Sequence, residues 1–345
     1  MRAVMYLAPG HIGLKQVPKP KPGWGEILVR VRAALTCGTD VKTYRRGHPK
    51  FPPPFIFGHE FAGDIVELGR GAAGFSIGQR VTANVFGECG ECYYCRQGQG
   101  NLCENLVYNF GAFAEYITVP ASIVSRNTFV IPDHIPYRNA AVLEPLVPVV
   151  HGLNLIRIQP GEIVAIIGAG GSISLMHLQL ARLAGAGEII AVGHSDSRLS
   201  TAARLGATKT INAHQENTTE AIRRSSGGRG ADVVIECAGT KEAWENSVNS
   251  VRKGGRVLWF GGLPGGTKVE LDAAFIHYGE ISLFGVHGGT AQDARQAFEL
   301  ICSGKLNSDI LLTDEYPLEA VETALQSMIR GETVKAVINP LMHAP

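Results

Sequence analysis

Six short apolar segments limit most strongly how this 345-residue chain can fold. They lie at 162–168, 188–193, 209–211, 231–239, 254–262 and 280–286. Apolar residues with helical spacing follow the first segment over 174–186, and further helices are expected at about 198–205 and 217–225. Strands that are apolar on both faces belong inside a parallel sheet covered by helices. The pattern predicts an α/β protein in which 149–286 form a Rossmann-type, doubly wound parallel sheet of six strands.

Residues 1–148 have a different pattern, rich in short strands and turns. Residues 26–34 alternate as a half-buried strand does, and the prolines of 51–54 exclude a helix interior. Repeated glycines after residue 57 indicate tight turns, so we expect a mostly-β domain. Residues 287–345 hold two helical stretches and a final strand-like segment. They have too little apolar surface to fold alone, and we expect them to pack back on the first domain.

Composition excludes several classes of function. The formal net charge is +1 and 18% of the residues are charged, so no basic excess indicates a nucleic acid or membrane partner. No apolar stretch approaches the ~18 residues of a membrane span, and the N-terminus lacks the apolar core of a signal peptide. We therefore expect a cytoplasmic protein whose thiols stay reduced.

Four of the seven cysteines fall in one short segment, about 87–105. They are Cys89, Cys92, Cys95 and Cys103, spaced C-x2-C-x2-C-x7-C. In a reducing compartment this spacing favours zinc over a disulfide framework, and a redox-active thiol pair is the alternative. Four thiolates complete a tetrahedral site and leave no position for a substrate. We therefore expect a structural zinc that holds a loop too polar to fold alone.

A glycine-rich turn, GAGGSIS, joins the first apolar segment to its helix. Gly168 and Gly170 match the first two glycines of the dinucleotide fingerprint, but the third position falls on Ile173. A frame shifted by one residue gives Ala169, Gly171 and Ser174. An ordinary turn between strand and helix is the alternative. Because the turn belongs to a segment with six predicted strands of a doubly wound sheet, we predict that it is a cofactor-binding loop. Its expected binding residues are Gly168, Gly170, Gly171, Ser172 and Ile173.

The end of the second predicted strand indicates which dinucleotide binds. An acidic residue there would bond the ribose hydroxyls and repel a 2′-phosphate. Gly193 occupies the expected position, and His194, Ser195 and Arg198 follow it. Hydroxyl and guanidinium groups suit a phosphate, so the prediction leans towards NADP over NAD. Asp196 keeps NAD open, since it lies only a little further along the chain.

A second candidate metal site combines residues that are distant from the four-cysteine segment. His59 and Glu60 are adjacent in GHEFAGDIVELG, and Cys37 lies upstream in TCGTDV. A lone cysteine usually packs in a core, and a His-Glu pair alone is a weak signal. Together the three supply thiolate, imidazole and carboxylate. Three protein ligands leave a position open for water or a substrate oxygen, as catalytic zinc requires.

GHEFAGDIVELG resembles the zinc alcohol dehydrogenase signature of the medium-chain dehydrogenase/reductase family. TCGTDV, the four-cysteine segment and the glycine loop occur in that family's order, and the resemblance covers essentially the whole chain. VLEPLVPVVHG (142–152) resembles the sorbitol and threonine dehydrogenase branch, and its EPL element resembles polyol dehydrogenases most. The resemblance implies a GroES-like catalytic domain, a Rossmann domain, a cleft between them and a homo-oligomer, either a dimer or a tetramer.

The resemblance also implies roles for single residues. Cys37 and His59 would bind a catalytic zinc, and Glu60 would bind it directly or exchange with water. Glu144 matches a further acidic residue near the metal, and Thr39 matches the hydroxyl that takes the alcohol proton. The four clustered cysteines match a structural zinc lobe, so two zinc ions per chain are expected.

The expected reaction is hydride transfer between a secondary alcohol and NAD(P). The substrate would be a polyol, a sugar alcohol or a cyclitol-like diol. A threonine-type or aliphatic alcohol is the alternative within the class, and a non-catalytic binding member is the alternative outside it. Lys42 departs from the family, since many relatives have a relay histidine there. It could contact a cofactor phosphate or an acidic substrate group, or be a solvated surface lysine. Phe110, Phe275 and His287 are guesses for the pocket lining, with core packing the alternative for the two phenylalanines.

Overall fold

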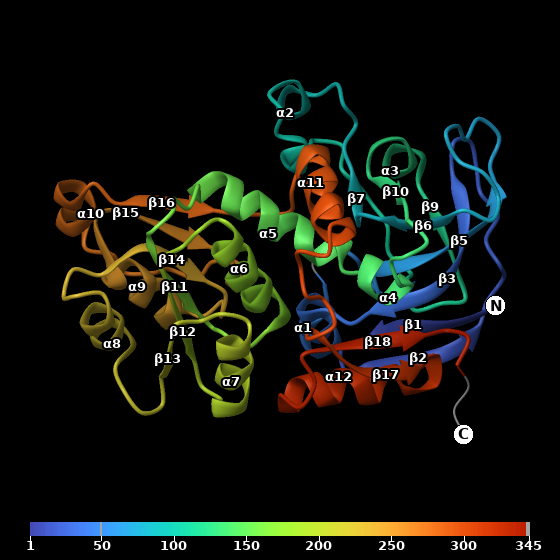
Figure 1. Ribbon diagram of the computed structural model, residues 1–345. Coiled ribbons are helices and arrows are strands. Elements are labelled where there is room, and N and C mark those ends of the chain that lie inside the picture. The colour runs from blue at the N-terminus through green and yellow to red at the C-terminus, as the bar shows by residue number, and fades with distance from the viewer. Residues whose placement is uncertain (49, 343–345) are drawn as a thin grey trace. The chain divides into compact units, whose positions relative to one another are not determined.

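The computed structural model describes residues 1–48 and 50–342, and within this part the chain divides into two compact units (Figure 1). Unit 1 comprises Met1–Val147 and Gly289–Pro345, and unit 2 comprises Pro148–Gly288. The N-terminal segment and the last elements of the chain therefore share a unit. Each unit has its own buried apolar cluster.

Unit 2, all of whose residues are described, contains a six-stranded parallel sheet in the order β13-β12-β11-β14-β15-β16. Its strands are β11 (Ile163–Ile167), β12 (Glu188–Gly193), β13 (Lys209–Asn212), β14 (Ala231–Glu236), β15 (Val251–Trp259) and β16 (Ser282–Gly285). Its helices are α6 (Ser172–Leu183), α7 (Asp196–Arg204), α8 (Thr218–Ser225), α9 (Lys241–Ser250) and α10 (Ala273–Gly279). The predicted doubly wound sheet is confirmed.

Strand composition explains this sheet. Four of the five residues of β11 are buried, as expected for a central strand covered on both faces. Helix α6 begins two residues earlier than predicted, because Gly171 is its N-cap. It ends at Leu183, and Gly185 with φ +87° then turns the chain towards β12.

Unit 1 is mostly β in its N-terminal part, as predicted. Its strands there are β1 (Arg2–Ala8), β2 (His11–Gln16), β3 (Ile27–Leu35), β4 (Phe55–Ile56), β5 (Glu60–Leu68), β6 (Arg80–Ala83), β7 (Phe86–Gly87), β8 (Val107–Tyr108), β9 (Tyr116–Val119) and β10 (Thr128–Val130). Its helices there are α1 (Gly38–Arg46), α2 (Tyr93–Arg96), α3 (Ala121–Arg126) and α4 (Tyr137–Ala140), with a 3-10 turn at Gly100–Leu102. Helix α5 (Leu143–Ile156) begins in unit 1 and continues into unit 2.

Strand β3 is the centre of the large sheet of unit 1. It pairs antiparallel with β5, β9 and the C-terminal strand β18 (Lys335–Asn339). The alternation at 26–34 predicted a half-buried strand. The strand is confirmed, but more of its residues are buried than predicted. Seven of the nine residues of β3 are buried, because both faces of the strand are covered.

The C-terminal segment joins the same sheet. It contains α11 (Ala291–Cys302), β17 (Leu312–Pro317), a 3-10 turn at Leu318–Ala320, α12 (Val321–Arg330) and β18. Strand β17 pairs parallel with β18 at the sheet edge and was not predicted from the sequence. Its residues LTDEYP are mainly polar and half exposed, so they lack the apolar signal of a buried strand.

One helical stretch among the described residues, Tyr137–Ile156, is long and apolar enough to cross a membrane by length and composition. Its mean hydropathy is 1.3, and 61% of the window is buried inside the protein. Core helices pass the same test, and this degree of burial accounts for the apolar character of the stretch.

Candidate metal and cofactor sites

The register of one strand pair brings Cys37, His59 and Glu60 together. In the β3–β5 ladder, Leu35 lies opposite Glu60, so Cys37 follows the end of β3 where β5 begins. One ligand atom from each of the three residues lies within 4.8 Å of the others. His59 and Glu60 are buried, and Cys37 is partly buried. Three residues from two chain segments thus form one compact donor group.

Asp40 supports this group from helix α1. Cys37 is the N-cap of the helix, and the Asp40 carboxylate accepts the Cys37 amide N–H at 2.8 Å. The other carboxylate oxygen, Oδ1, lies 3.2 Å from Nδ1 of His59. Burial lowers the pKa of His59, but Asp40 more than offsets this and raises it well above the ordinary value. A carboxylate beside Nδ1 favours a proton on that nitrogen, which would leave Nε2 available as a metal ligand.

Glu60 is held by a buried lysine from the far end of the chain. Lys335 Nζ donates to both Glu60 carboxylate oxygens, at 2.8 and 2.5 Å, and to the Thr36 carbonyl oxygen at 2.7 Å. Lys335 and Glu60 are 1% and 0% exposed, so solvent does not screen the pair. Burial raises the pKa of Glu60 to about 7 even though Lys335 opposes this shift.

Glu144 approaches the same group from the first turn of α5. Its Oε2 lies 3.9 Å from Nε2 of His59, and burial raises the pKa of its carboxyl group. Both oxygens of Glu60 already accept from Lys335. The structure therefore places the Glu144 carboxylate near the imidazole nitrogen that faces away from Asp40, and a Glu60 oxygen within 4.8 Å of a His59 ring nitrogen.

The donor set fits zinc. Ligands about 2.0–2.3 Å from a tetrahedral zinc lie roughly 3.3–3.8 Å apart, and the 4.8 Å limit needs only a small contraction. Burial, followed by the charge of Glu60, raises the pKa of the Cys37 thiol. A bound dication would reverse this, so zinc binding would release the thiol proton.

Aromatic side chains line one side of the donor group. The Phe110 ring lies 5.4 Å from the His59 ring and 4.3 Å from the Phe51 ring. The wider aromatic cluster consists of His48, Phe51, Phe55, Tyr108 and Phe110. Phe110 and Phe51 are half-buried, so an apolar surface partly open to solvent adjoins the metal ligands.

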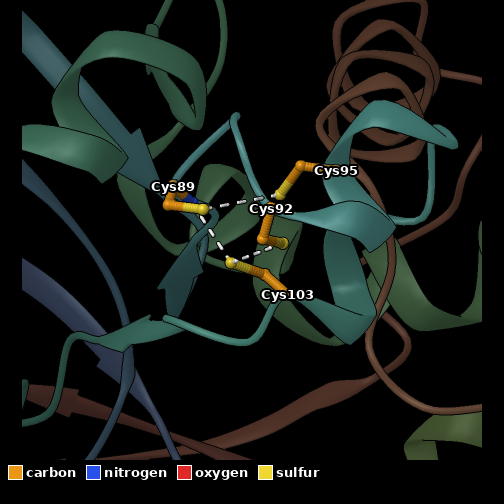
Figure 2. A group of neighbouring side chains, drawn as sticks. All are labelled: Cys89, Cys92, Cys95 and Cys103. Carbon is orange, nitrogen blue, oxygen red and sulfur yellow. Dashed lines mark hydrogen bonds between the residues drawn. The ribbon is translucent and has the colours of Figure 1, made fainter.

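The four clustered cysteines converge in the lobe after β7 (Figure 2). The Sγ atoms of Cys89 and Cys95 are 4.0 Å apart, and those of Cys92 and Cys103 are 3.9 Å apart. Four sulfurs about 2.3 Å from a zinc ion would be separated by about 3.8 Å. Backbone amides also donate to these sulfurs, and those of Glu91 and Cys92 lower the pKa of Cys89 to about 6. The geometry fits a closed site of four thiolate ligands.

In unit 2 the glycine loop bends sharply between β11 and α6. Gly168 and Gly170 have φ of +86° and +118°, which side chains rarely adopt. A Cβ on Gly168 would lie 2.6 Å from the Ala238 amide nitrogen, and one on Gly170 would lie 2.5 Å from Arg198 Cβ. Ser174 Oγ accepts the Gly170 N–H at 3.0 Å, so a serine closes the loop in the shifted frame. Ser172 and Ile173 begin α6, where helix amides can receive a phosphate.

A cavity of about 550 Å³ adjoins this loop. Gly168, Gly193, His194, His214 and Thr240 are among its lining residues. Gly193 is the last residue of β12, and Ser195 is the N-cap of α7. The carboxyl edge of a doubly wound sheet is where nucleotides bind, so the cavity fits the adenosine part of a dinucleotide.

Two protein-family models match this chain. Residues 23–133 match the alcohol dehydrogenase GroES-like domain model, and residues 172–303 match the zinc-binding dehydrogenase model. Sorbitol dehydrogenase of Bacillus subtilis is 33% identical over 99% of this chain and 97% of its own length. L-threonine 3-dehydrogenase of Pyrococcus horikoshii is 34% identical over 98% of both chains. A solved zinc-binding dehydrogenase of Sinorhizobium meliloti bound to NADP is 34% identical, with a TM-score of 0.91 over 98% of this chain and 99% of that one.

The chain belongs to the zinc-dependent medium-chain dehydrogenase/reductase family. It is an oxidoreductase of the alcohol dehydrogenase class, as its two family domains and its relatives show. The matched family models and the related solved structure also confirm the predicted GroES-like and Rossmann folds.

Some expectations for this dehydrogenase changed with the structure. Phe275 packs against the apolar cluster of unit 2, so core packing describes it better than pocket lining. Lys42 is exposed on α1, as a solvated surface lysine would be. His287 is exposed just after β16. Thr39 is half-buried, and its amide donates to Cys37 Sγ at 3.4 Å.

Sequence reasoning missed Asp40 and Lys335. Asp40 had a signal, because it lies three residues after Cys37 at the start of a helix, which is capping-box spacing. The sequence signal for Lys335 was weaker, because it is only a lone lysine in the apolar segment VKAVI. Its partner Glu60 is 275 residues away in the sequence.

We predict that Lys335→Met destabilises the dehydrogenase by about 3–5 kcal/mol, because it leaves the buried Glu60 carboxyl group and the Thr36 carbonyl oxygen without their shared partner. Urea unfolding of chelator-treated protein at pH 7.5 measures the change. Lys305→Met removes an exposed lysine from the same unit and should change stability by less than ~0.5 kcal/mol. Equal, small effects of both substitutions would contradict the role of the ion pair.

Proposed function

We propose that this dehydrogenase oxidises a secondary hydroxyl of a polyol or cyclitol-like substrate, with zinc at the Cys37 group and NADP as the preferred cofactor. The observation that carries the proposal is the incomplete donor set. Cys37, His59 and one carboxylate supply three ligands, and the fourth position remains for the substrate oxygen. Glu60 or Glu144 would be the acidic ligand, directly or through water.

Zinc held there would act as a Lewis acid on the substrate oxygen and lower the pKa of the hydroxyl. The chain's own residues prepare that chemistry. Asp40, 3.2 Å from Nδ1, would favour a proton on that nitrogen of His59, and Lys335 balances the charge of Glu60. Thr39 would take the hydroxyl proton and pass it outward. The carbon-bound hydrogen would leave with its electron pair to the nicotinamide, which is reduced as the alcohol becomes a carbonyl.

The aromatic cluster favours a polyol or cyclitol over threonine. Phe110 and Phe51 present apolar faces beside His59, which can contact the C–H face of a carbon chain or ring. An amino acid substrate would need a cation for its carboxylate, and Phe51 and Phe110 supply none. The lysine beside this cluster, Lys50, already donates to the Tyr108 hydroxyl at 2.7 Å. Relatives of similar identity bear both names, sorbitol dehydrogenase and L-threonine 3-dehydrogenase. The threonine-type reaction is therefore the second candidate.

Arg198 supports the preference for NADP. Its side-chain carbons lie against Gly170 of the glycine loop, and it follows the end of β12 by five residues. Asp196, the carboxylate residue nearest to Arg198 in the sequence, accepts a hydrogen bond from Asn212 at 2.7 Å. A guanidinium beside the ribose position would pair with a 2′-phosphate. The related Sinorhizobium structure was solved with NADP.

The four-cysteine lobe would hold a second, structural zinc, since four thiolates leave no ligand position open. Its free thiols suit a reducing compartment, and we propose a cytoplasmic location. A homo-oligomer, dimer or tetramer, completes the proposal on the basis of family membership.

Metal content tests both zinc sites. We expect about two zinc ions per chain in the wild type and about one in either Cys37→Ser or Cys92→Ser, measured by atomic emission. Cys37→Ser should lose turnover by at least ~10³-fold while keeping its fold by circular dichroism. One zinc in the wild type, unchanged in Cys37→Ser, would exclude the catalytic site.

A substrate panel tests the reaction. We expect reduction of the nicotinamide, followed by its absorbance, with acyclic polyols, cyclitols or both, and kcat/KM at least ~10-fold higher than with L-threonine. Higher kcat/KM for threonine would support the second candidate. No turnover of any alcohol by fully zinc-loaded protein with either cofactor would support a non-catalytic member of the fold.

Cofactor kinetics test the role of Arg198. We expect kcat/KM to be higher with NADP than with NAD, and Arg198→Ala to reduce the NADP value by about 10–100-fold while changing the NAD value little. Arg204→Ala removes an exposed arginine from the same helix and should change neither. Equal values for the two cofactors in the wild type would contradict the preference.

A further inference from the structure

Two exposed histidines meet at the rim of the unit 2 cavity. The His194 and His214 rings have centroids 4.5 Å apart and are tilted by 50°. Both residues line the cavity and both are exposed. This histidine pair, His194 and His214, plays no part in the function proposed above.

Sheet topology explains why the two rings meet. Strands β12 and β13 are parallel neighbours, with Gly193 opposite Asn212. The Ala213 amide donates to the Gly193 carbonyl oxygen at 2.8 Å and extends the ladder by one residue. His194 and His214 follow directly at the carboxyl edge of the sheet. That edge, at the end of β12, is where the ribose of a bound dinucleotide would lie.

The charged groups around the pair come from three directions. Asp196 and Arg198 lie at the start of α7, with Asp196 bonded to Asn212. Glu216 precedes α8 and is paired with Arg224. Glu242, on α9, also lines the cavity. Among the residues that line the cavity, His194 and His214 are those that can become cationic, and Arg198 packs against the adjoining glycine loop. The carboxylates of Asp196 and Glu216 already have partners.

Two adjacent imidazole rings influence each other's charge. Imidazole is the side chain whose charge ordinarily changes between pH 5 and 8. Two positively charged rings at this separation would repel each other. A phosphate dianion beside the rings would remove that repulsion and accept a charge-assisted hydrogen bond. Phosphate binding and proton uptake by the pair would then be linked.

We propose that His194 and His214 form a proton-dependent clamp for the 2′-phosphate of NADP, so that selection of NADP over NAD strengthens as pH falls from about 8.5 to 6.5. The inference rests on the proposed use of NADP and adds the residues that make the preference depend on pH. Of the three groups, Arg198 alone supplies a fixed positive charge. Below about pH 6 the phosphate itself takes up a proton, which limits the effect at the acidic end.

Calorimetric titration of the zinc-loaded full chain with adenosine 2′,5′-bisphosphate and with 5′-AMP tests the clamp without catalysis. Both probes carry the same adenine and ribose, so their Kd ratio isolates the 2′-phosphate. We expect the bisphosphate to bind about tenfold more tightly at pH 6.5 than at 8.5, with little change for 5′-AMP. Titration in buffers of different ionisation enthalpy should show proton uptake with the bisphosphate alone.

The double variant H194N/H214N should keep a preference for the bisphosphate, through Arg198, but lose its pH dependence and its proton uptake. His277→Asn is the matched control, since it replaces an exposed histidine that contacts an aromatic ring in the same unit, outside the residues lining the cavity. It should behave as the wild type does. A wild-type preference that is independent of pH, or one whose pH dependence survives in the double variant, would overturn the clamp and leave the NADP assignment intact. No preference for the bisphosphate at any pH would overturn both.

Discussion

The register between β3 and β5 is the constraint on which the metal site depends. Leu35 lies opposite Glu60, and on the other side of β3, Val337 of β18 also lies opposite Leu35. Three chain segments therefore converge where β3 ends, and they bring Cys37, Glu60 and Lys335 into one buried group. A shift of one residue in either pairing would turn the side chains to the opposite face of the sheet. The extensive burial of β3 makes such a shift costly.

The two metal groups of this dehydrogenase differ in how they use charge. The four-cysteine lobe supplies a complete set of sulfur ligands from one short segment, which suits a metal that stabilises a loop. The Cys37 group supplies fewer ligands and surrounds them with buried charges: Asp40 beside His59, Lys335 against Glu60, and Glu144 near Nε2. Such buried charges would be costly in an ordinary core, and a bound cation gives them a role.

In the proposed cofactor site, unit 2 separates two kinds of recognition along one sheet edge. The glycine loop needs positive φ and close backbone contact, so its residues are restricted by geometry. The ends of β12 and β13 are followed by side chains instead, those of the histidine pair directly and that of Arg198 from the first turn of α7. Selection between cofactors can therefore vary at these strand ends while the loop keeps its shape.

Apolar periodicity and local spacing were sufficient to predict the six-stranded sheet, the mostly-β N-terminal part, the glycine loop and the four-cysteine lobe. These features depend on residues close together in the chain. The polar edge strand β17 was missed, since its side chains lack an apolar pattern, and Phe275 was left open between pocket and core, since an aromatic residue suits both. Sequence by itself also identified Cys37, His59 and Glu60 as candidates through residue type and motif. Only the tertiary structure decided their environment, because the Lys335–Glu60 ion pair joins residues 275 positions apart and depends on strand pairings that no local pattern specifies.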